Sequence, residues 1–198
     1  MPVDLLWALA IFAFVSSVTP GTNNMMLLSS GANFGVRRTV PHALGVALGF
    51  TLMVAVVGLG LAGLFSSYPV LLVAMKWIGA AYMLFLAVKI ARSAPLTERS
   101  TKTRPMTFIQ AAAFQWVNPK AWIMAVTAVA TYTRPDRYVA TVLIVAAVFG
   151  AVNLPSVWSW VVFGSALRRI LSDPWKLRAF NWTMAALLIA SLYPALRE

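Results

Sequence analysis

Two short stretches combine a proline with polar residues inside apolar sequence, and together they could bind a small charged molecule. They are TPGTNN at residues 19–24 and NPK at residues 118–120. Proline breaks a helix because it lacks an N–H and clashes with the preceding turn, and a Thr or Asn before it can cap the helix that follows. The exposed N-terminal end of such a helix attracts a carboxylate, and a lysine beside it adds a full positive charge. We therefore expect a substrate-binding site formed by Pro20, Gly21, Asn23, Asn24, Asn118, Pro119 and Lys120.

Of these residues, Lys120 costs the most free energy to place inside a membrane. It lies about 15 residues from both Arg104 and Arg134, which places it near the middle of an apolar segment. A lysine at the centre of a bilayer costs roughly 2.5–3.5 kcal/mol on insertion scales, and both interfaces are too distant for its side chain to reach. Two interpretations remain: a contact with substrate, or a structural partner such as carbonyl groups freed by the first break. For the asparagines the structural alternative is hydrogen bonding between helices.

The elements that must hold these residues are membrane helices. The chain of 198 residues is 61% hydrophobic and only 11% charged, far from the composition of a soluble domain. Its apolar runs are long enough to cross ~30 Å of hydrocarbon at ~1.5 Å per residue, and none alternates as barrel strands do. We expect an all-α membrane protein with about six transmembrane helices, the first and fourth of them broken or kinked. The runs cover residues 3–19, 39–65, 69–88, 106–133, 138–164 and 179–196.

The basic residues are distributed unevenly between the two sides of the membrane. With six spans, eleven Lys and Arg residues fall in the connections after spans one, three and five, against three on the opposite side. This positive-inside bias predicts a multi-pass protein of the bacterial inner membrane with both termini on the non-cytoplasmic side. The net charge of +11 therefore indicates topology and contact with the lipid bilayer, not nucleic-acid binding.

The chain divides into two halves around a polar segment. We expect a first three-helix repeat at residues 1–92, a cytoplasmic linker at 93–105 and a second three-helix repeat at 106–198. Pro20 and Pro119 lie 99 residues apart, each in the first span of its half. An odd number of spans in each half inverts the second repeat relative to the first, as in several transporter folds.

Other features are less specific. Gly45 and Gly49 form a GxxxG pattern, which predicts close helix packing either within one subunit or in a homodimer. Asn153 and Pro155 form another polar kink and a candidate pore lining. His42, the only histidine, is expected at the membrane interface and not as a proton carrier.

The chain resembles the LysE (lysine exporter) superfamily, particularly its RhtB-like branch of amino-acid exporters. The family's Thr-Pro-Gly-Pro-Asn motif is matched except that Thr22 replaces the second proline, and its Gly-x-Arg-x-Gly element is matched except at Thr39. The resemblance implies export of amino acids or related metabolites across the inner membrane, with proton exchange as one mode of coupling. The residues that carry it are Thr19, Pro20, Gly21, Asn23, Gly35, Arg37, Gly45, Gly49, Asn118, Pro119 and Lys120.

The residues near the two breaks narrow the function further. No acidic residue lies deep in a predicted span, so nothing there pairs with a cationic side chain, and we expect a small, neutral, zwitterionic amino-acid substrate. One histidine and no cysteine argue against a metal-ion exporter, and we expect neither a metal site nor a cofactor. An intramembrane enzyme needs a nucleophile–base pair, and no grouping of Ser, Lys or His supplies a convincing one, although Ser and Lys form such a pair in principle. The metal-ion exporter and the enzyme are therefore the less favoured alternatives. A non-transporting structural membrane subunit remains as an alternative.

Overall fold

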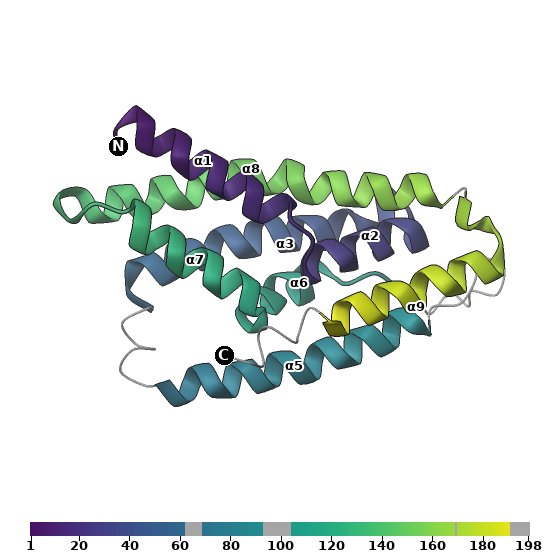
Figure 1. Cartoon of the computed structure of the whole chain (residues 1–198). Helices are drawn as coiled ribbons and strands as arrows, with labels where there is room; N and C mark the ends of the chain where they lie inside the picture. The colour runs from purple at the N-terminus through teal and green to yellow at the C-terminus, as the bar shows by residue number, and fades with distance from the viewer. Residues whose placement is uncertain (62–68, 93–103, 169, 191–198) are drawn as a thin grey trace.

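The described part of the chain is helical throughout. The computed structural model describes residues 1–61, 69–92, 104–168 and 170–190, and no strand occurs among them (Figure 1). The short elements are η1 (Val57–Leu61), η2 (Gln115–Val117), η3 (Pro135–Arg137) and η4 (Ile170–Ser172). The all-α prediction is confirmed. The α-helices are α1 (Val3–Val18), α2 (Thr22–Phe34), α3 (Val36–Val56), α5 (Pro69–Ala91), α6 (Phe108–Phe114), α7 (Pro119–Tyr132), α8 (Tyr138–Leu167) and α9 (Pro174–Ala190).

The first break separates α1 from α2, which are bent by 55° relative to one another. We predicted that Thr19 caps the second helix and that Pro20 starts it, and both details are wrong. The Thr19 hydroxyl donates back to the Val15 carbonyl at 2.5 Å, and Pro20 lies exposed in the break. Gly21 precedes α2 and provides no side-chain cap. The new helix thus begins at Thr22, two residues later than expected, because Gly21 separates the proline from it.

The second break has the predicted geometry. Asn118 leaves the helical region with φ −91° and ψ 109°, and its Oδ1 accepts a hydrogen bond from the Lys120 backbone N–H at 3.2 Å. Pro119 is the first residue of α7, where its missing N–H costs nothing.

The two helices that follow the breaks run in opposite directions. Both α2 and α7 begin near the middle of the molecule and extend toward opposite ends (Figure 1). Helix α8 runs alongside them with 30 residues and packs against α1, α2 and α3. The helix continues through Asn153 and Pro155 without a break.

Two glycines of α3 allow it to approach α6 closely. A Cβ at Gly45 would lie 2.4 Å from the Phe108 carbonyl oxygen, and one at Gly49 would lie 2.6 Å from the Cα of Ala112. The GxxxG pattern therefore packs α3 against α6 of the same chain. Because α6 of the same subunit covers both glycines, this pattern gives no support to a homodimer.

Only some of the expected spans meet a strict test of length and apolar composition. Among the described residues, Val36–Gly60 and Pro135–Leu167 can each cross a membrane, and the bent pair α1–α2 makes a third if it is one span. Residues 62–65 and 191–196 of the expected spans, and residues 93–103 of the expected linker, lie outside the described part of the chain.

Candidate functional site

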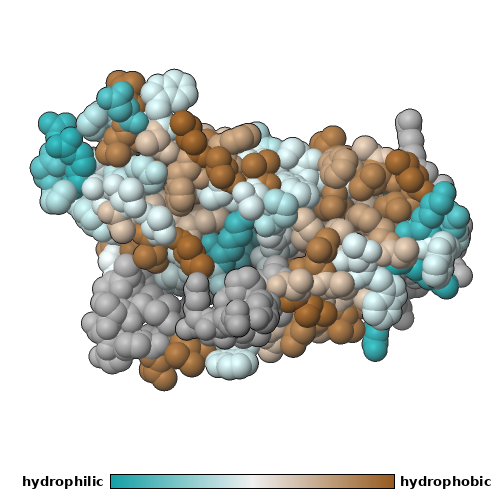
Figure 2. Space-filling model, viewed as in Figure 1, coloured by the Kyte–Doolittle hydropathy of each residue, from teal (hydrophilic) through white to brown (hydrophobic). Residues whose placement is uncertain are grey.

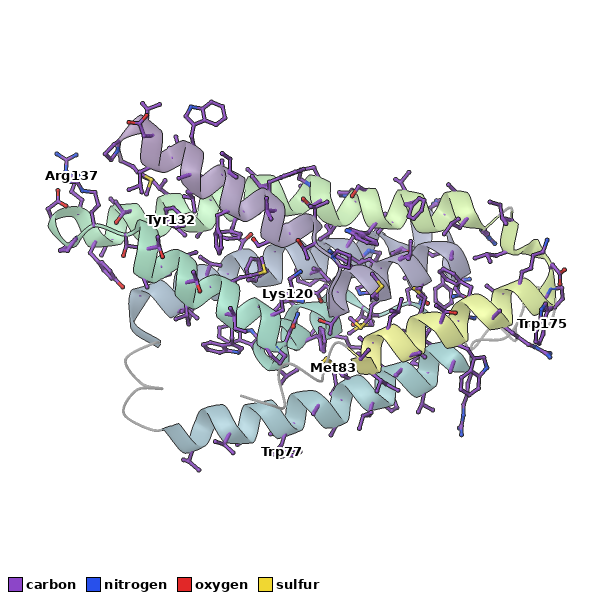
Figure 3. All side chains as sticks on the ribbon, viewed as in Figure 1. Trp77, Met83, Lys120, Tyr132, Arg137 and Trp175 are labelled. Atoms are coloured by element: carbon purple, nitrogen blue, oxygen red, sulfur yellow. The ribbon has the colours of Figure 1, made fainter. Side chains whose placement is uncertain are left out.

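The two breaks meet in the middle of the molecule. Figure 2 shows a hydrophilic strip between apolar surfaces, at the place where Figure 3 labels Lys120. The Lys120 ammonium donates a hydrogen bond to the Thr19 carbonyl at 2.7 Å, across 101 residues of sequence. Thr19 lies at the end of α1, where Pro20 leaves carbonyl groups without helical partners. The structural partner considered for Lys120 is thus present.

Gly21 allows the lysine to lie across the first break. A Cβ on Gly21 would come within 2.9 Å of the Lys120 Cδ and 3.1 Å of its Nζ. The φ of Gly21 is −170°, an extended conformation that any residue adopts. Glycine is needed here for space and not for backbone freedom.

Asn24 provides hydrogen bonds to the backbone carbonyl groups at the C-terminal end of α1. Its Nδ2 donates to the carbonyls of Ser17 at 2.8 Å and Thr19 at 2.9 Å, and the residue is 4% exposed. Asn24 is therefore mainly a structural cap, and it fixes the carbonyl that Lys120 also contacts.

A second link between the breaks involves a residue that we did not predict. Asn23 Nδ2 donates to Gln115 Oε1 at 2.8 Å, and Gln115 Nε2 donates to Asn23 Oδ1 at 3.3 Å and to the Ala111 carbonyl at 2.8 Å. Gln115 is fully buried. Its position as a lone amide in the apolar run before Asn118 is the signal that could have identified it.

The breaks enclose a cavity of about 360 Å³, counting its open mouth. Lys120 and Asn23 lie in its wall, and Asn153 of α8 lines it as expected of a pore-lining residue. Its walls are formed by Ser16, Ser17, Gly21, Thr22, Asn23, Asn24, Val46, Phe50, Asn118, Lys120, Ala121, Met124, Asn153 and Val157. Of the predicted site residues, Pro20 and Pro119 shape the breaks but are not among these lining residues.

Several polar groups in this wall are unused. The hydroxyls of Ser17 and Thr22 are buried and have no hydrogen-bond partner among the described residues. The first N–H groups of α2 have no side-chain cap, so the positive end of a 13-residue helix faces the cavity beside Lys120. None of the lining residues is acidic. The cavity can therefore accept an anionic group at one point and hydrogen-bond donors at others.

No group of three or more His, Cys, Asp or Glu residues close enough to hold a metal ion occurs in the described ranges.

Comparison with known proteins identifies the family. A model of the LysE type translocator family matches residues 14–191, most of the chain. The chain belongs to this family. LysE translocators are membrane transporters, so the protein is a transporter and not an enzyme, and the family resemblance noted from the sequence is confirmed.

Curated relatives align along nearly the whole chain. A cysteine/O-acetylserine efflux protein of Klebsiella pneumoniae subsp. pneumoniae is 32% identical over 197 residues, covering 96% of this chain and 95% of the relative. A protein of the same name from Escherichia coli strain K12 is 31% identical over 197 residues, covering 96% of each chain. No solved structure gives a significant match.

Proposed function

We propose that this LysE translocator exports small, neutral, zwitterionic amino acids or related metabolites across the bacterial inner membrane. The observation that carries the proposal is the cavity between the breaks, which combines Lys120 and the open end of α2 with no acidic lining residue. The relatives named for efflux of cysteine and O-acetylserine support the same substrate class.

The substrate carboxylate would bind at Lys120 and the N-terminus of α2. An ammonium has three N–H donors, and Lys120 uses one of them on the Thr19 carbonyl at 2.7 Å. The others can reach a carboxylate without breaking the link between the two halves. The uncapped N–H groups of α2, beginning at Thr22, add donors and a partial positive charge on the same side.

The substrate ammonium would bind to neutral oxygens. Asn23, Asn24 and backbone carbonyls of the first break are the acceptors expected from sequence, and the unused hydroxyls of Ser17 and Thr22 add two more. An ammonium bound by neutral oxygens needs no carboxylate, whereas a cationic side chain would add a second charge that nothing in the wall pairs. A neutral substrate follows from this difference.

The architecture that we propose for transport is a pair of inverted repeats, 1–92 and 106–198, joined by a cytoplasmic linker at 93–105. It is supported by the opposite directions of α2 and α7 (Figure 1), and by the cavity that Thr22 at the start of α2 and Lys120 near the start of α7 both line. Six spans in this arrangement place both termini on the non-cytoplasmic side, in keeping with the positive-inside bias. In exchange with protons, the coupling charge would reside on Lys120 or on the substrate, because no carboxylate lines the cavity.

Substrate counterflow in proteoliposomes tests this function. Vesicles that contain only this protein and are loaded with unlabelled serine should accumulate labelled serine from outside. An inactive membrane subunit would give no counterflow, which would reject the proposal.

Competition in the same vesicles tests the substrate class. Unlabelled cysteine and O-acetylserine should inhibit serine uptake strongly, and arginine and lysine weakly. Preferential transport of arginine would contradict the inference drawn from the missing acidic residue.

A further inference from the structure

A second cavity of about 450 Å³, counting its open mouth, lies toward the other end of α2 from the proposed site. It is enclosed by α2, α3, the end of α5 and the segment before α6. Ser30 in its wall follows Asn24 of the first cavity by six residues, or about 9 Å along the helix axis. Its rim carries the basic residues that the charge bias assigns to the cytoplasmic side. Its lining includes Met26, Ser29, Ser30, His42, Lys89 and Arg104.

His42 forms the buried polar part of this cavity. The residue is 2% exposed, and both ring nitrogens are buried without a hydrogen-bond partner among the described residues. The sequence places His42 near the membrane interface, and in the structure α3 turns its side chain inward. Buried polar groups in proteins are nearly always hydrogen-bonded, so an imidazole with two unused nitrogens calls for a ligand or water.

The neighbouring hydroxyls do not supply that partner. Ser30 Oγ bonds to Thr39 Oγ1 at 3.0 Å, and Ser29 Oγ accepts from Asn33 at 3.3 Å. These serines are already engaged, and what faces the cavity from α3 is the histidine.

The positive charge of the residues that line the cavity favours a negatively charged ligand. Arg104 and Lys89 lie exposed at the rim, and none of the described residues that line the cavity is acidic. A group bound between the buried imidazole and Arg104 is therefore an anion. The remaining wall is mostly apolar and suits a small side chain.

An apolar layer separates the two cavities. His42 lines one cavity, and Val46, one turn further along α3, lines the other. Val46, Met26 and Val157 belong to one buried apolar cluster. A polar molecule in the second cavity has to pass this layer to reach Lys120.

We propose that the second cavity is a vestibule that binds the carboxylate of an amino acid before it crosses this layer. His42 donates a ring N–H to the carboxylate, Arg104 supplies the opposite charge, and the apolar wall takes the side chain. This inference rests on the proposed export function, in which the substrate binds in the vestibule before it reaches the cavity at Lys120.

The single histidine makes a direct binding test possible. With ¹⁵N-histidine label, the whole protein in phosphatidylcholine nanodiscs gives ring signals from one residue only. Adding serine should shift one ring nitrogen in a saturable manner, whereas serine methyl ester, which lacks the carboxylate, should not. Unchanged signals at serine concentrations that saturate counterflow would overturn the proposal.

A lipid headgroup could supply the same anionic chemistry, and one arm of the experiment distinguishes it. Nanodiscs containing phosphatidylglycerol are compared with phosphatidylcholine alone. If phosphatidylglycerol shifts the ring signal and serine has no further effect, the occupant is a lipid and the vestibule is rejected. If serine shifts the signal in both membranes, the vestibule is supported.

Transport kinetics test the role of the bound state. Replacing His42 by leucine, or Arg104 by glutamine, should raise the apparent KM at the vestibule face by about tenfold with little change in maximum rate, as expected for loss of a hydrogen bond to a charged group. His42→Gln keeps an N–H donor and should restore most of the affinity. Arg178→Gln, a basic residue on the same predicted side that does not line the cavity, is the control.

The outcomes separate the vestibule from the export function. Unchanged KM in both vestibule variants, with intact counterflow, would overturn the vestibule alone. A serine-dependent shift of the histidine signal in a protein without counterflow would support the binding site and reject export.

Discussion

Replacing Lys120 by methionine separates a substrate contact from a structural tether. The substitution keeps an aliphatic chain over Gly21 and removes the ammonium that donates to the Thr19 carbonyl at 2.7 Å. A hydrogen bond from a charged donor is worth about 1.5–3 kcal/mol. The Thr19 carbonyl keeps a second donor, Asn24 Nδ2 at 2.9 Å, so it is not left unsatisfied.

The loss of this bond is offset by removal of the charge. A lysine near the bilayer centre costs roughly 2.5–3.5 kcal/mol, which the variant no longer incurs. The two effects are similar in size and opposite in sign, so we expect the free energy of unfolding to change by about 1 kcal/mol or less. The melting temperature of the variant in detergent should therefore stay close to that of the wild type.

Transport should respond much more strongly. A carboxylate that loses a charged partner worth about 1.5–3 kcal/mol binds roughly 10- to 150-fold more weakly. At serine concentrations near the wild-type KM, counterflow by Lys120→Met should fall close to that of empty vesicles. Lys176→Met, an exposed lysine on α9, is the matched control and should transport at the wild-type rate.

Two results would refute this reasoning. A wild-type counterflow rate in Lys120→Met would show that the substrate does not need the lysine. A large fall in melting temperature, in parallel with transport, would show that Lys120 only holds the two breaks together.

Three other substitutions test the geometry around the site. Gln115→Leu removes both hydrogen bonds to Asn23 and should lower stability by about 1–3 kcal/mol, measured as a lower melting temperature; an unchanged value would mean that the pair contributes nothing. Gly21→Ala should reduce counterflow, because its Cβ displaces the Lys120 side chain, and should lower stability by up to about 1.5–3 kcal/mol through loss of the bond to the Thr19 carbonyl; wild-type counterflow would mean that the lysine keeps its place. Gly164→Ala places a Cβ 2.1 Å from an α2 carbonyl oxygen and should destabilise the protein by about 1–3 kcal/mol or prevent its accumulation; an unchanged melting temperature would mean that α2 and α8 can move apart at no cost.

Local chemistry explains which details of the breaks could be predicted. Asn118 and Pro119 are adjacent to the helix that they start, so cap and first residue follow from residue preferences alone. Around Pro20 the same preferences compete with Gly21 and with the hydrogen bond from Thr19 to Val15. Nothing in the order of residues shows which of these interactions prevails.

Contacts between segments that are distant in the chain could not be predicted from the sequence. The Lys120–Thr19 bond was one of two interpretations, but the partnership of Gln115 with Asn23 depends on how two helices pack. Sequence indicates the depth of a residue in the membrane, whereas its direction depends on the rotation of the helix. His42 shows the difference, because it lies near a membrane interface in sequence and points into a cavity in the structure.

The bond between Lys120 and Thr19 also constrains how the protein is made. Its two ends are 101 residues apart, so at about 5–20 residues per second roughly 5–20 s pass before the ribosome has added the lysine. Gln115, the hydrogen-bond partner of Asn23, is synthesised 92 residues after it, so a similar time passes before this pair can form. During synthesis the first half therefore holds a polar break without its partners, and it reaches its final state only when the second half inserts beside it.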